Sequence, residues 1–141
     1  IYNEQFLSCE TKDYKFGLKG YVDRYTVDHD KEEINIIDLK TTGKSISDFE
    51  DSIEFYNYWM QAAIYKKLVL SEMPETAKYY NLTYRFVVID KYNQVYVFLV
   101  TDKTMTMWEN RLKTTLDVAE YHCINNRYDL PYKFLTQTVT L

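Results

Sequence analysis

An aspartate and a lysine stand two residues apart at the end of an apolar run, in the segment INIIDLKTTGK at residues 34–44. Side chains two residues apart on a β-strand point to the same face, so Asp38 and Lys40 are expected to project together. A second carboxylate, Asp23, lies on the preceding predicted strand. If the connection turns around residues 28–33, Asp23 comes close to Asp38 across the strand pair.

Two carboxylates that are close together repel each other, and burying them is costly. A divalent cation removes the conflict, since Mg²⁺ prefers six oxygen ligands and keeps part of its water shell. The backbone carbonyl of Leu39, between Asp38 and Lys40, is the candidate third protein ligand. Lys40 would then orient or deprotonate a water molecule, or stabilise charge on a phosphate. The alternative is an ordinary cross-strand salt bridge, because D-x-K triplets are common.

A glutamine and a tyrosine extend this set of candidates. Gln61 and Tyr65 are four residues apart and share one face of a predicted helix. They are placed to hydrogen-bond to a phosphate or to the residues of the metal site. The alternative is a half-buried pair whose hydrogen bonds are satisfied within the domain. Gly20, three residues before Asp23, completes the pattern.

The elements that must position these residues are predicted from hydrophobic periodicity. Strands are expected at residues 3–10, 16–27, 34–40, 84–90 and 94–100, and helices at about Ser52–Leu70 and Thr104–Asn126, with a loop at residues 41–51. The apolar stripe of the first helix is Ile53, Tyr56, Met60, Ile64 and Leu68, and that of the second is Met105, Trp108, Leu112, Leu116, Ala119 and Cys123. This order predicts an α/β fold of the α+β kind, a mixed sheet with helices packed on it.

The composition is that of one globular domain covering residues 1–141, with 46% apolar residues for a core. Two cysteines are too few for a disulfide framework or a cysteine-held cluster, so a reducing, intracellular setting is expected. The sequence shows neither an apolar run long enough for a membrane span nor a signal peptide. The chain begins at Ile1 without a methionine, so upstream residues could be missing.

The net charge of −4 is unevenly distributed along the chain. Residues 1–58 carry thirteen acids and seven bases, whereas the remaining 83 residues carry eight acids and ten bases. This balance disfavours a nucleic-acid binder that relies on a long basic patch. The acidic part contains Asp23 and Asp38, which is consistent either with a solvated acidic loop or with carboxylates that attract a cation.

The order of these motifs resembles the PD-(D/E)XK nuclease superfamily, and most closely its RecB-type branch of phage and prophage recombination exonucleases. The resemblance is carried by G-x-x-D, then D-x-K on the next strand, then Q-x-x-x-Y on the next helix. The corresponding segments are GYVDR at residues 20–24, IIDLKTT at 36–42 and QAAIY at 61–65. The predicted hairpin at residues 84–100 also resembles the later strands of that family.

The resemblance implies a restriction-endonuclease-like core, with a central mixed β-sheet flanked by helices, and cleavage of DNA that depends on Mg²⁺ or Mn²⁺. Carried over by motif, Asp23, Asp38 and the carbonyl of Leu39 would be metal ligands. Lys40 would be the catalytic lysine, and Gln61 and Tyr65 would be supporting residues of the active site.

The chain also departs from the branch. Members usually carry a histidine, or a comparable acid, on a helix before the first strand, and neither His29 nor His122 lies there. Such a helix would precede Ile1, and Glu4 and Glu10 are the alternative acidic candidates for the metal site. Some members hold an iron–sulfur cluster on four cysteines, which is not expected here.

The expected function is therefore that of a DNA exonuclease in phage-type recombination or end processing, in the cytoplasm of a bacterial or phage-infected cell. DNA is the expected partner, together with a recombination protein and further copies of the chain, and no membrane. The alternatives are a structure-specific endonuclease and a non-catalytic domain that binds nucleic acid or protein. The aromatic residues before Gln61, namely Tyr56, Tyr58 and Trp59, are candidates to guide DNA, although a core role is the commoner explanation.

Overall fold

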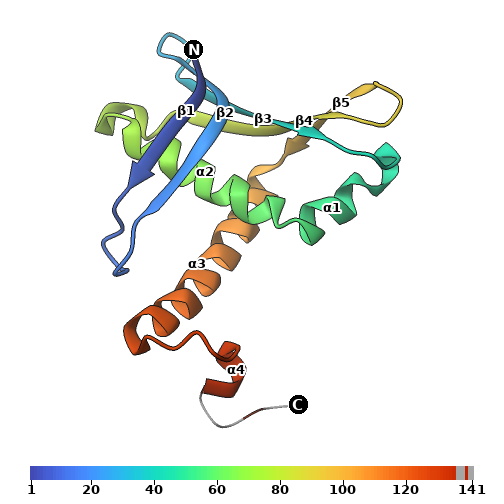
Figure 1. Cartoon of the computed structure of the whole chain (residues 1–141). Helices are drawn as coiled ribbons and strands as arrows, with labels where there is room; N and C mark the ends of the chain where they lie inside the picture. The colour runs from blue at the N-terminus through green and yellow to red at the C-terminus, as the bar shows by residue number, and fades with distance from the viewer. Residues whose placement is uncertain (136–138, 140–141) are drawn as a thin grey trace.

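A five-stranded mixed sheet frames the molecule in the computed structural model, which describes residues 1–135 and 139 (Figure 1). The strands follow one another across the sheet in chain order. They are β1 (Tyr2–Cys9), β2 (Leu18–Asp28), β3 (Glu33–Thr41), β4 (Asn81–Ile89) and β5 (Val95–Val100). β3 and β4 are parallel, and the other neighbouring pairs are antiparallel. The predicted mixed sheet is thereby confirmed.

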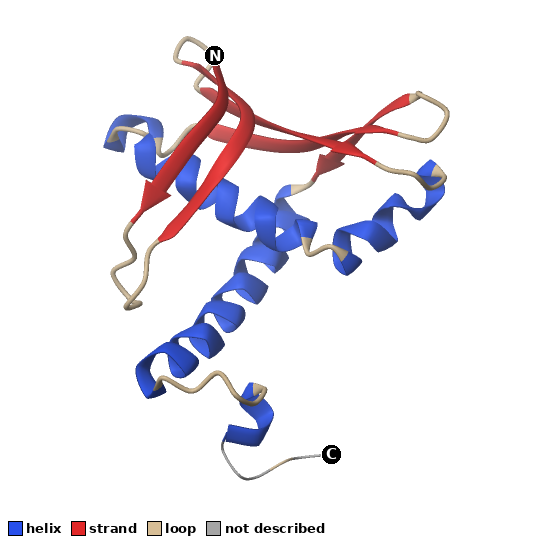
Figure 2. Ribbon diagram, viewed as in Figure 1, coloured by secondary structure: helices blue, strands red, loops and turns tan. Residues whose placement is uncertain are grey.

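The helices lie together on one side of the sheet (Figure 2). They are η1 (Ile46–Asp48), α1 (Phe49–Phe55), α2 (Tyr58–Glu72), η2 (Glu75–Ala77), α3 (Asp102–Asn125) and α4 (Tyr132–Leu135). α1 and α2 form the crossover that a parallel pair of strands requires, here between β3 and β4. In the described part of the chain, no helix is long and apolar enough to cross a membrane.

The alternation of side chains along β3 and β4 decides which residues face the helices. Ile34 and Ile36 of β3 are fully buried, as are Phe86 and Val88 of β4. Successive side chains of a strand point to opposite faces, so every second residue of β3 lies on this covered face. Asp38 continues the series after Ile36 and is therefore carried into the interior.

The single helix predicted at Ser52–Leu70 is in fact two helices. Asn57 adopts a left-handed conformation with φ 57°, which ends α1 and begins α2. The predicted apolar stripe of this helix was therefore wrong at Tyr56, which is 53% exposed. The predicted loop at residues 41–51 also contains η1 and the start of α1.

The buried face of α2 differs from the predicted stripe for a physical reason. α2 contacts β1 and β2 on one side and α3 on another, so it is apolar in two directions. Its buried residues are Trp59, Ala62, Ala63, Leu68 and Val69. The longer stripe of α3 was predicted better, since Met105, Leu112 and Leu116 are buried, although Ala119 is exposed.

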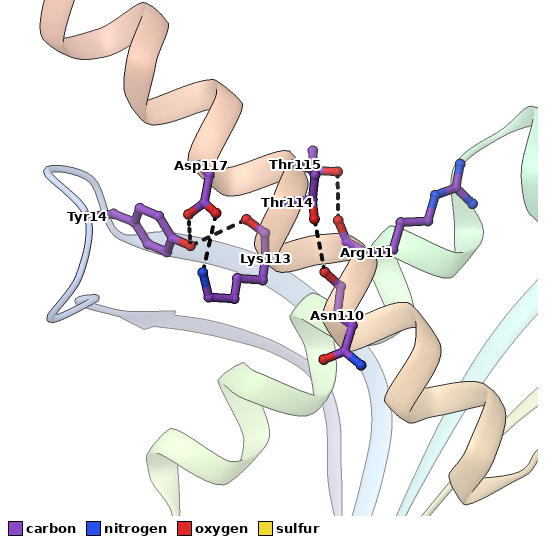
Figure 3. A network of polar contacts seen from close by, with 7 residues as sticks. All are labelled: Tyr14, Asn110, Arg111, Lys113, Thr114, Thr115 and Asp117. Atoms are coloured by element: carbon purple, nitrogen blue, oxygen red, sulfur yellow. Dashed lines mark hydrogen bonds and ion pairs between the residues drawn. The ribbon is translucent and has the colours of Figure 1, made fainter.

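The connection between β1 and β2 is held against α3 by a polar contact (Figure 3). The hydroxyl of Tyr14 donates to Oδ1 of Asp117 at 2.8 Å, and Nζ of Lys113 lies 3.3 Å from the other oxygen of that carboxylate. Burial and the hydrogen bond to Asp117 raise the pKa of Tyr14 to about 12. The contact joins the far end of the first hairpin to the helical layer.

Gly20 on β2 allows α2 to approach the sheet closely. A Cβ atom at this position would lie 3.0 Å from Cε1 of Tyr65 and 3.4 Å from Cδ1 of Leu68. The absence of a side chain therefore makes room for the ring of Tyr65, which belongs to the candidate site described below.

We expect Gly20→Val to lower the free energy of unfolding by about 1–3 kcal/mol, the usual cost of overpacking a well-packed contact. The matched control is Gly43→Val, because nothing lies within 4 Å of a Cβ at Gly43. Urea unfolding of the two variants and the parent measures the difference. Equal stability of the two variants would contradict the packing argument.

Candidate active site

The antiparallel ladder between β2 and β3 stops where the candidate residues begin. It runs from the pair Asp28 and Glu33 to the pair Arg24 and Ile37. Continuing this register by one residue would place Asp23 opposite Asp38, although the ladder itself does not pair them. Asp23 is exposed, whereas Asp38 is buried. The two strands thus separate at the point where both carry a carboxylate.

The Asp23 side chain occupies the gap between the two strands. Its Oδ2 accepts a hydrogen bond from the backbone N–H of Leu39 at 2.8 Å, in place of a backbone acceptor. Because the N–H and C=O groups of one strand residue point to the same neighbour, the carbonyl of Leu39 faces this gap as well. The geometry is that expected of a candidate backbone ligand.

A local irregularity of β1 and β2 accompanies this gap. Val22 and Tyr25 are both buried although they are three residues apart, so the alternation of β2 breaks around Asp23. Glu4 lies between Asn3 and Gln5, which pair with Arg24 and Val22, but it is not itself paired in the ladder. It has φ 46°, an unusual conformation for a residue other than glycine. Strained backbone of this kind concentrates at functional sites and re-aims side chains. In the sequence, this irregularity is indicated only by the spacing of three between the apolar residues Val22 and Tyr25.

Asp38 is a buried carboxylate, 1% exposed. Its Oδ2 accepts a hydrogen bond of 2.7 Å from the hydroxyl of Tyr84. Its Oδ1 lies 3.1 Å from Nζ of Lys40, yet makes no well-formed hydrogen bond to any described residue. One oxygen of this carboxylate is therefore left with unused acceptor capacity in the interior.

The surroundings of Asp38 favour its neutral form. Burial raises the pKa of the carboxyl above its ordinary value, while the Lys40 ammonium and the Tyr84 hydroxyl lower it, and the Asp23 carboxylate raises it further. The net direction is upward, so desolvation outweighs the ion pair. The same contact acts on Tyr84, whose pKa lies well above its ordinary value because of burial and of Asp38.

Lys40 connects this carboxylate to α2. Its Nζ donates to Oε1 of Gln61 at 2.5 Å and lies 4.2 Å from the centre of the Tyr58 ring. Nε2 of Gln61 in turn donates to the hydroxyl of Tyr65 at 2.8 Å. The structure thus brings the helical pair Gln61 and Tyr65 to the D-x-K motif.

Two tyrosines in this cluster were missed by the sequence analysis. Tyr84 reaches Asp38 because β3 and β4 pair in parallel, with Asp38 beside Phe86. Neither this register nor its direction is visible in a single sequence. Tyr58 was noted only as an aromatic residue near Gln61, and its contact with Lys40 depends on the break at Asn57.

The remaining candidate residues, two glutamates and two histidines, lie in different parts of the fold. Glu4 lies on the part of β1 that runs beside Val22 and Arg24, whereas Glu10 follows the end of β1 beside the other end of the hairpin. His29 contacts Tyr80 at the turn after β2, and His122 lies on α3. Among residues 1–135 and 139, no three acidic, histidine or cysteine side chains form a metal-binding group.

The donor set nevertheless fits a hard divalent cation. Mg²⁺ is usually held by one or two carboxylates and retains several waters, so three acidic ligands are not required. The Asp23 carboxylate is near enough to raise the pKa of Asp38, the carbonyl of Leu39 faces the gap that Asp23 occupies, and Oδ1 of Asp38 has unused acceptor capacity. These are all oxygen donors, which suit Mg²⁺ or Mn²⁺ rather than a soft metal.

Comparison with known proteins gives one family and one fold. The sequence model of the PD-(D/E)XK nuclease superfamily matches residues 3–127. A solved structure from Eubacterium rectale, described as a "Putative exonuclease", is similar with a TM-score of 0.66 and 17% identity. The match covers 91% of this chain and 47% of that protein, so the chain spans about half of its length. The fold is thus the restriction-endonuclease-like one. The comparison with curated proteins found no match to the sequence.

In the metal-free protein we expect Asp38→Asn to raise the free energy of unfolding at pH 7, by about 1 kcal/mol. A carboxyl with a raised pKa in the folded chain contributes stability below its unfolded pKa and loses it as the pH rises through the folded pKa. The advantage of Asn should therefore vanish at a pH below about 3.9, the unfolded value.

Urea unfolding in EDTA at neutral and acid pH measures this effect. Asp30→Asn is the matched control, because Asp30 is an exposed carboxylate in the turn after β2. A loss of stability at pH 7 for Asp38→Asn would show that its charged form is well solvated or fully paired, contrary to the structure.

Proposed function

The chain belongs to the PD-(D/E)XK nuclease superfamily, and from this membership we propose that it is a metal-dependent deoxyribonuclease that acts from DNA ends. The observation that carries the proposal is the cluster around Asp38. Among the described residues, Oδ1 of this buried carboxylate meets the ammonium of Lys40 at 3.1 Å without a well-formed hydrogen bond. Lys40 is itself held by a glutamine and an aromatic ring. If Asp38 and Lys40 formed only a structural salt bridge, the buried carboxylate would keep acceptor capacity that no hydrogen bond uses.

In the proposed site, Asp23, Asp38 and the carbonyl of Leu39 hold Mg²⁺ or Mn²⁺. When bound, such an ion polarises a phosphodiester and lowers the pKa of a coordinated water. Of the two further acidic candidates, Glu4 is the nearer to Asp23 along the first hairpin, because its neighbours Asn3 and Gln5 pair with Arg24 and Val22.

The neighbours of Lys40 favour one of its two candidate roles. A carboxylate, an amide oxygen and the face of a ring surround Nζ, and all three attract a proton donor or a cation. Lys40 is therefore placed to donate hydrogen bonds to a phosphate oxygen or an attacking water rather than to accept a proton. Tyr65 holds the amide of Gln61, which orients Lys40.

The reaction proposed is hydrolysis of a phosphodiester. The oxygen of a water forms a bond to phosphorus as the bond to the leaving oxygen breaks, which yields a phosphate monoester and a hydroxyl. Negative charge accumulates on the phosphate oxygens in the transition state, and the ammonium of Lys40 stabilises that charge.

Action from DNA ends is supported by the description of the Eubacterium rectale protein, which shares the fold. It also agrees with the resemblance to recombination exonucleases, so end processing in recombination or repair is part of the proposal. A structure-specific endonuclease and a non-catalytic binding domain are separated from it by the first experiment below.

We expect the parent protein to degrade linear DNA with Mg²⁺ or Mn²⁺ and to leave covalently closed circles intact. Asp38→Ala and Lys40→Ala should each lower the rate by about 100-fold or more, as the loss of a charge-stabilising group does in comparable sites. Lys31→Ala, in the exposed turn after β2, is the matched control and should retain the activity of the parent. Product release from end-labelled linear and circular substrates measures all four proteins.

Cleavage of closed circles would contradict the proposed exonuclease activity and support an endonuclease activity. Absence of cleavage with either metal, together with unchanged metal binding in the two site variants, would favour the non-catalytic domain.

A second expectation concerns the tyrosine that holds Asp38. Tyr84→Phe should weaken Mn²⁺ binding by about 10-fold, because hydrogen bonds that orient a metal ligand usually contribute a factor of that size. Titration calorimetry measures the affinity directly, without DNA. Tyr79→Phe is the control, since Tyr79 is 90% exposed and lies outside the cluster. Equal affinities would show that Tyr84 does not orient Asp38 toward the metal.

A further inference from the structure

A cavity of about 430 Å³ opens beside the candidate active site. One wall is the loop that continues β3 beyond Lys40, at residues 41–44, and the other is formed by the rings of Tyr56 and Tyr58 at the junction of α1 and α2. Its volume falls within the range of about 300–1,000 Å³ that is typical of small-ligand pockets. None of the described residues that line it is acidic, although the chain as a whole has a net charge of −4.

Three aromatic rings, of which Tyr56 and Tyr58 line this cavity, follow one another in contact from the candidate catalytic lysine. Nζ of Lys40 lies 4.2 Å from the centre of the Tyr58 ring. The ring of Tyr56 stacks on that of Tyr58, with centres 5.5 Å apart and planes at 26°. Phe55 meets Tyr56 edge-on at 87°. The stack therefore leads from the site of the proposed chemistry to the surface.

The outer end of the stack is exposed. Tyr56 is 53% exposed and Phe55 is 75% exposed, so two neighbouring large rings are held in solvent. Both rings lie at the end of α1, directly before the helix break at Asn57. Trp59, by contrast, is buried and its ring is covered by the guanidinium of Arg111, so it takes no part in this surface.

A positive charge lies close to the outermost of these rings, Phe55. Lys44 lines the cavity, and its Nζ lies 6.0 Å from the centre of the Phe55 ring. An exposed ring paired with an ammonium is the combination by which proteins hold unpaired nucleotides, since the base stacks and the backbone phosphate meets the positive charge. Bases within a duplex are already stacked on both faces and are not open to this contact.

We propose that this cavity binds a single-stranded nucleotide next to the scissile phosphate, with its base stacked on Tyr56 and its phosphate near Lys44. The proposal rests on the proposed nuclease function, whose substrate it narrows to DNA with an unpaired strand at the site of cleavage. Continuity of the ring stack with Lys40 supports the placement. Tyr56 is then a specificity-determining residue, and Lys40 remains the group that meets the phosphate to be cleaved.

The test is binding of a short single-stranded DNA that contains 2-aminopurine, a base whose fluorescence is quenched by stacking. In EDTA, where no metal supports hydrolysis, Tyr56→Ala should bind this strand at least about fivefold more weakly, the lower end for loss of one base–ring stack. Tyr56→Phe keeps the ring and should restore binding and quenching. Tyr79→Ala, which removes an exposed tyrosine elsewhere, should bind as the parent does, and all variants should bind blunt duplex equally.

The outcomes separate this inference from the proposed function. Single-strand binding by Tyr56→Ala that equals the parent's, or an equal loss for duplex, would overturn the stacking site. So would absence of single-strand binding by the parent both in EDTA and with Mn²⁺. Hydrolysis is measured on the same proteins with Mn²⁺. If the parent binds single strands through Tyr56 but does not cut DNA, the stacking site is supported and the nuclease function is refuted. If the parent cuts DNA and the loss of Tyr56 has no effect on binding, the nuclease function is supported and the stacking site is refuted.

Discussion

The burial of one carboxylate is the constraint around which this structure is organised. Asp38 follows Ile34 and Ile36 on the covered face of β3, because the strand alternation admits no other position. An ionised group in the interior is costly unless it is paired and hydrogen-bonded. The hydroxyl of Tyr84 and the ammonium of Lys40 offset only part of this cost, since the pKa of Asp38 remains raised mainly by burial.

The helical layer covers Asp38 and Lys40 and also positions them. α2 approaches β2 at Gly20, where a Cβ atom would lie only 3.0 Å from the ring of Tyr65. Tyr65 then holds Gln61, and Gln61 holds Lys40. Because Gln61 and Tyr65 both belong to α2, a shift of the helix would be transmitted to Lys40 through the hydrogen bond from Lys40 to Gln61. This links the packing of the core to the geometry of the site.

Two departures from regular structure lie next to the site, and both expose groups that a regular element would have hidden. The left-handed residue Glu4 and the broken alternation of β2 occur where Asp23 turns into the gap beside β3. The left-handed residue Asn57 interrupts the helix and turns Tyr56 toward solvent. Local rules are commonly broken at functional sites, because such sites need conformations that regular elements do not supply.

The sequence by itself determined the five strands, the long last helix and the face on which Asp38 and Lys40 project, because these follow from local periodicity. The spacing of Gln61 and Tyr65 also placed them together in advance. Only the tertiary structure decided that β3 and β4 pair in parallel, which brings Tyr84 to Asp38, and that Asn57 divides the helix, which brings Tyr58 to Lys40. The register between distant strands and a single left-handed residue arise from packing of the whole chain, and local patterns carry no record of them.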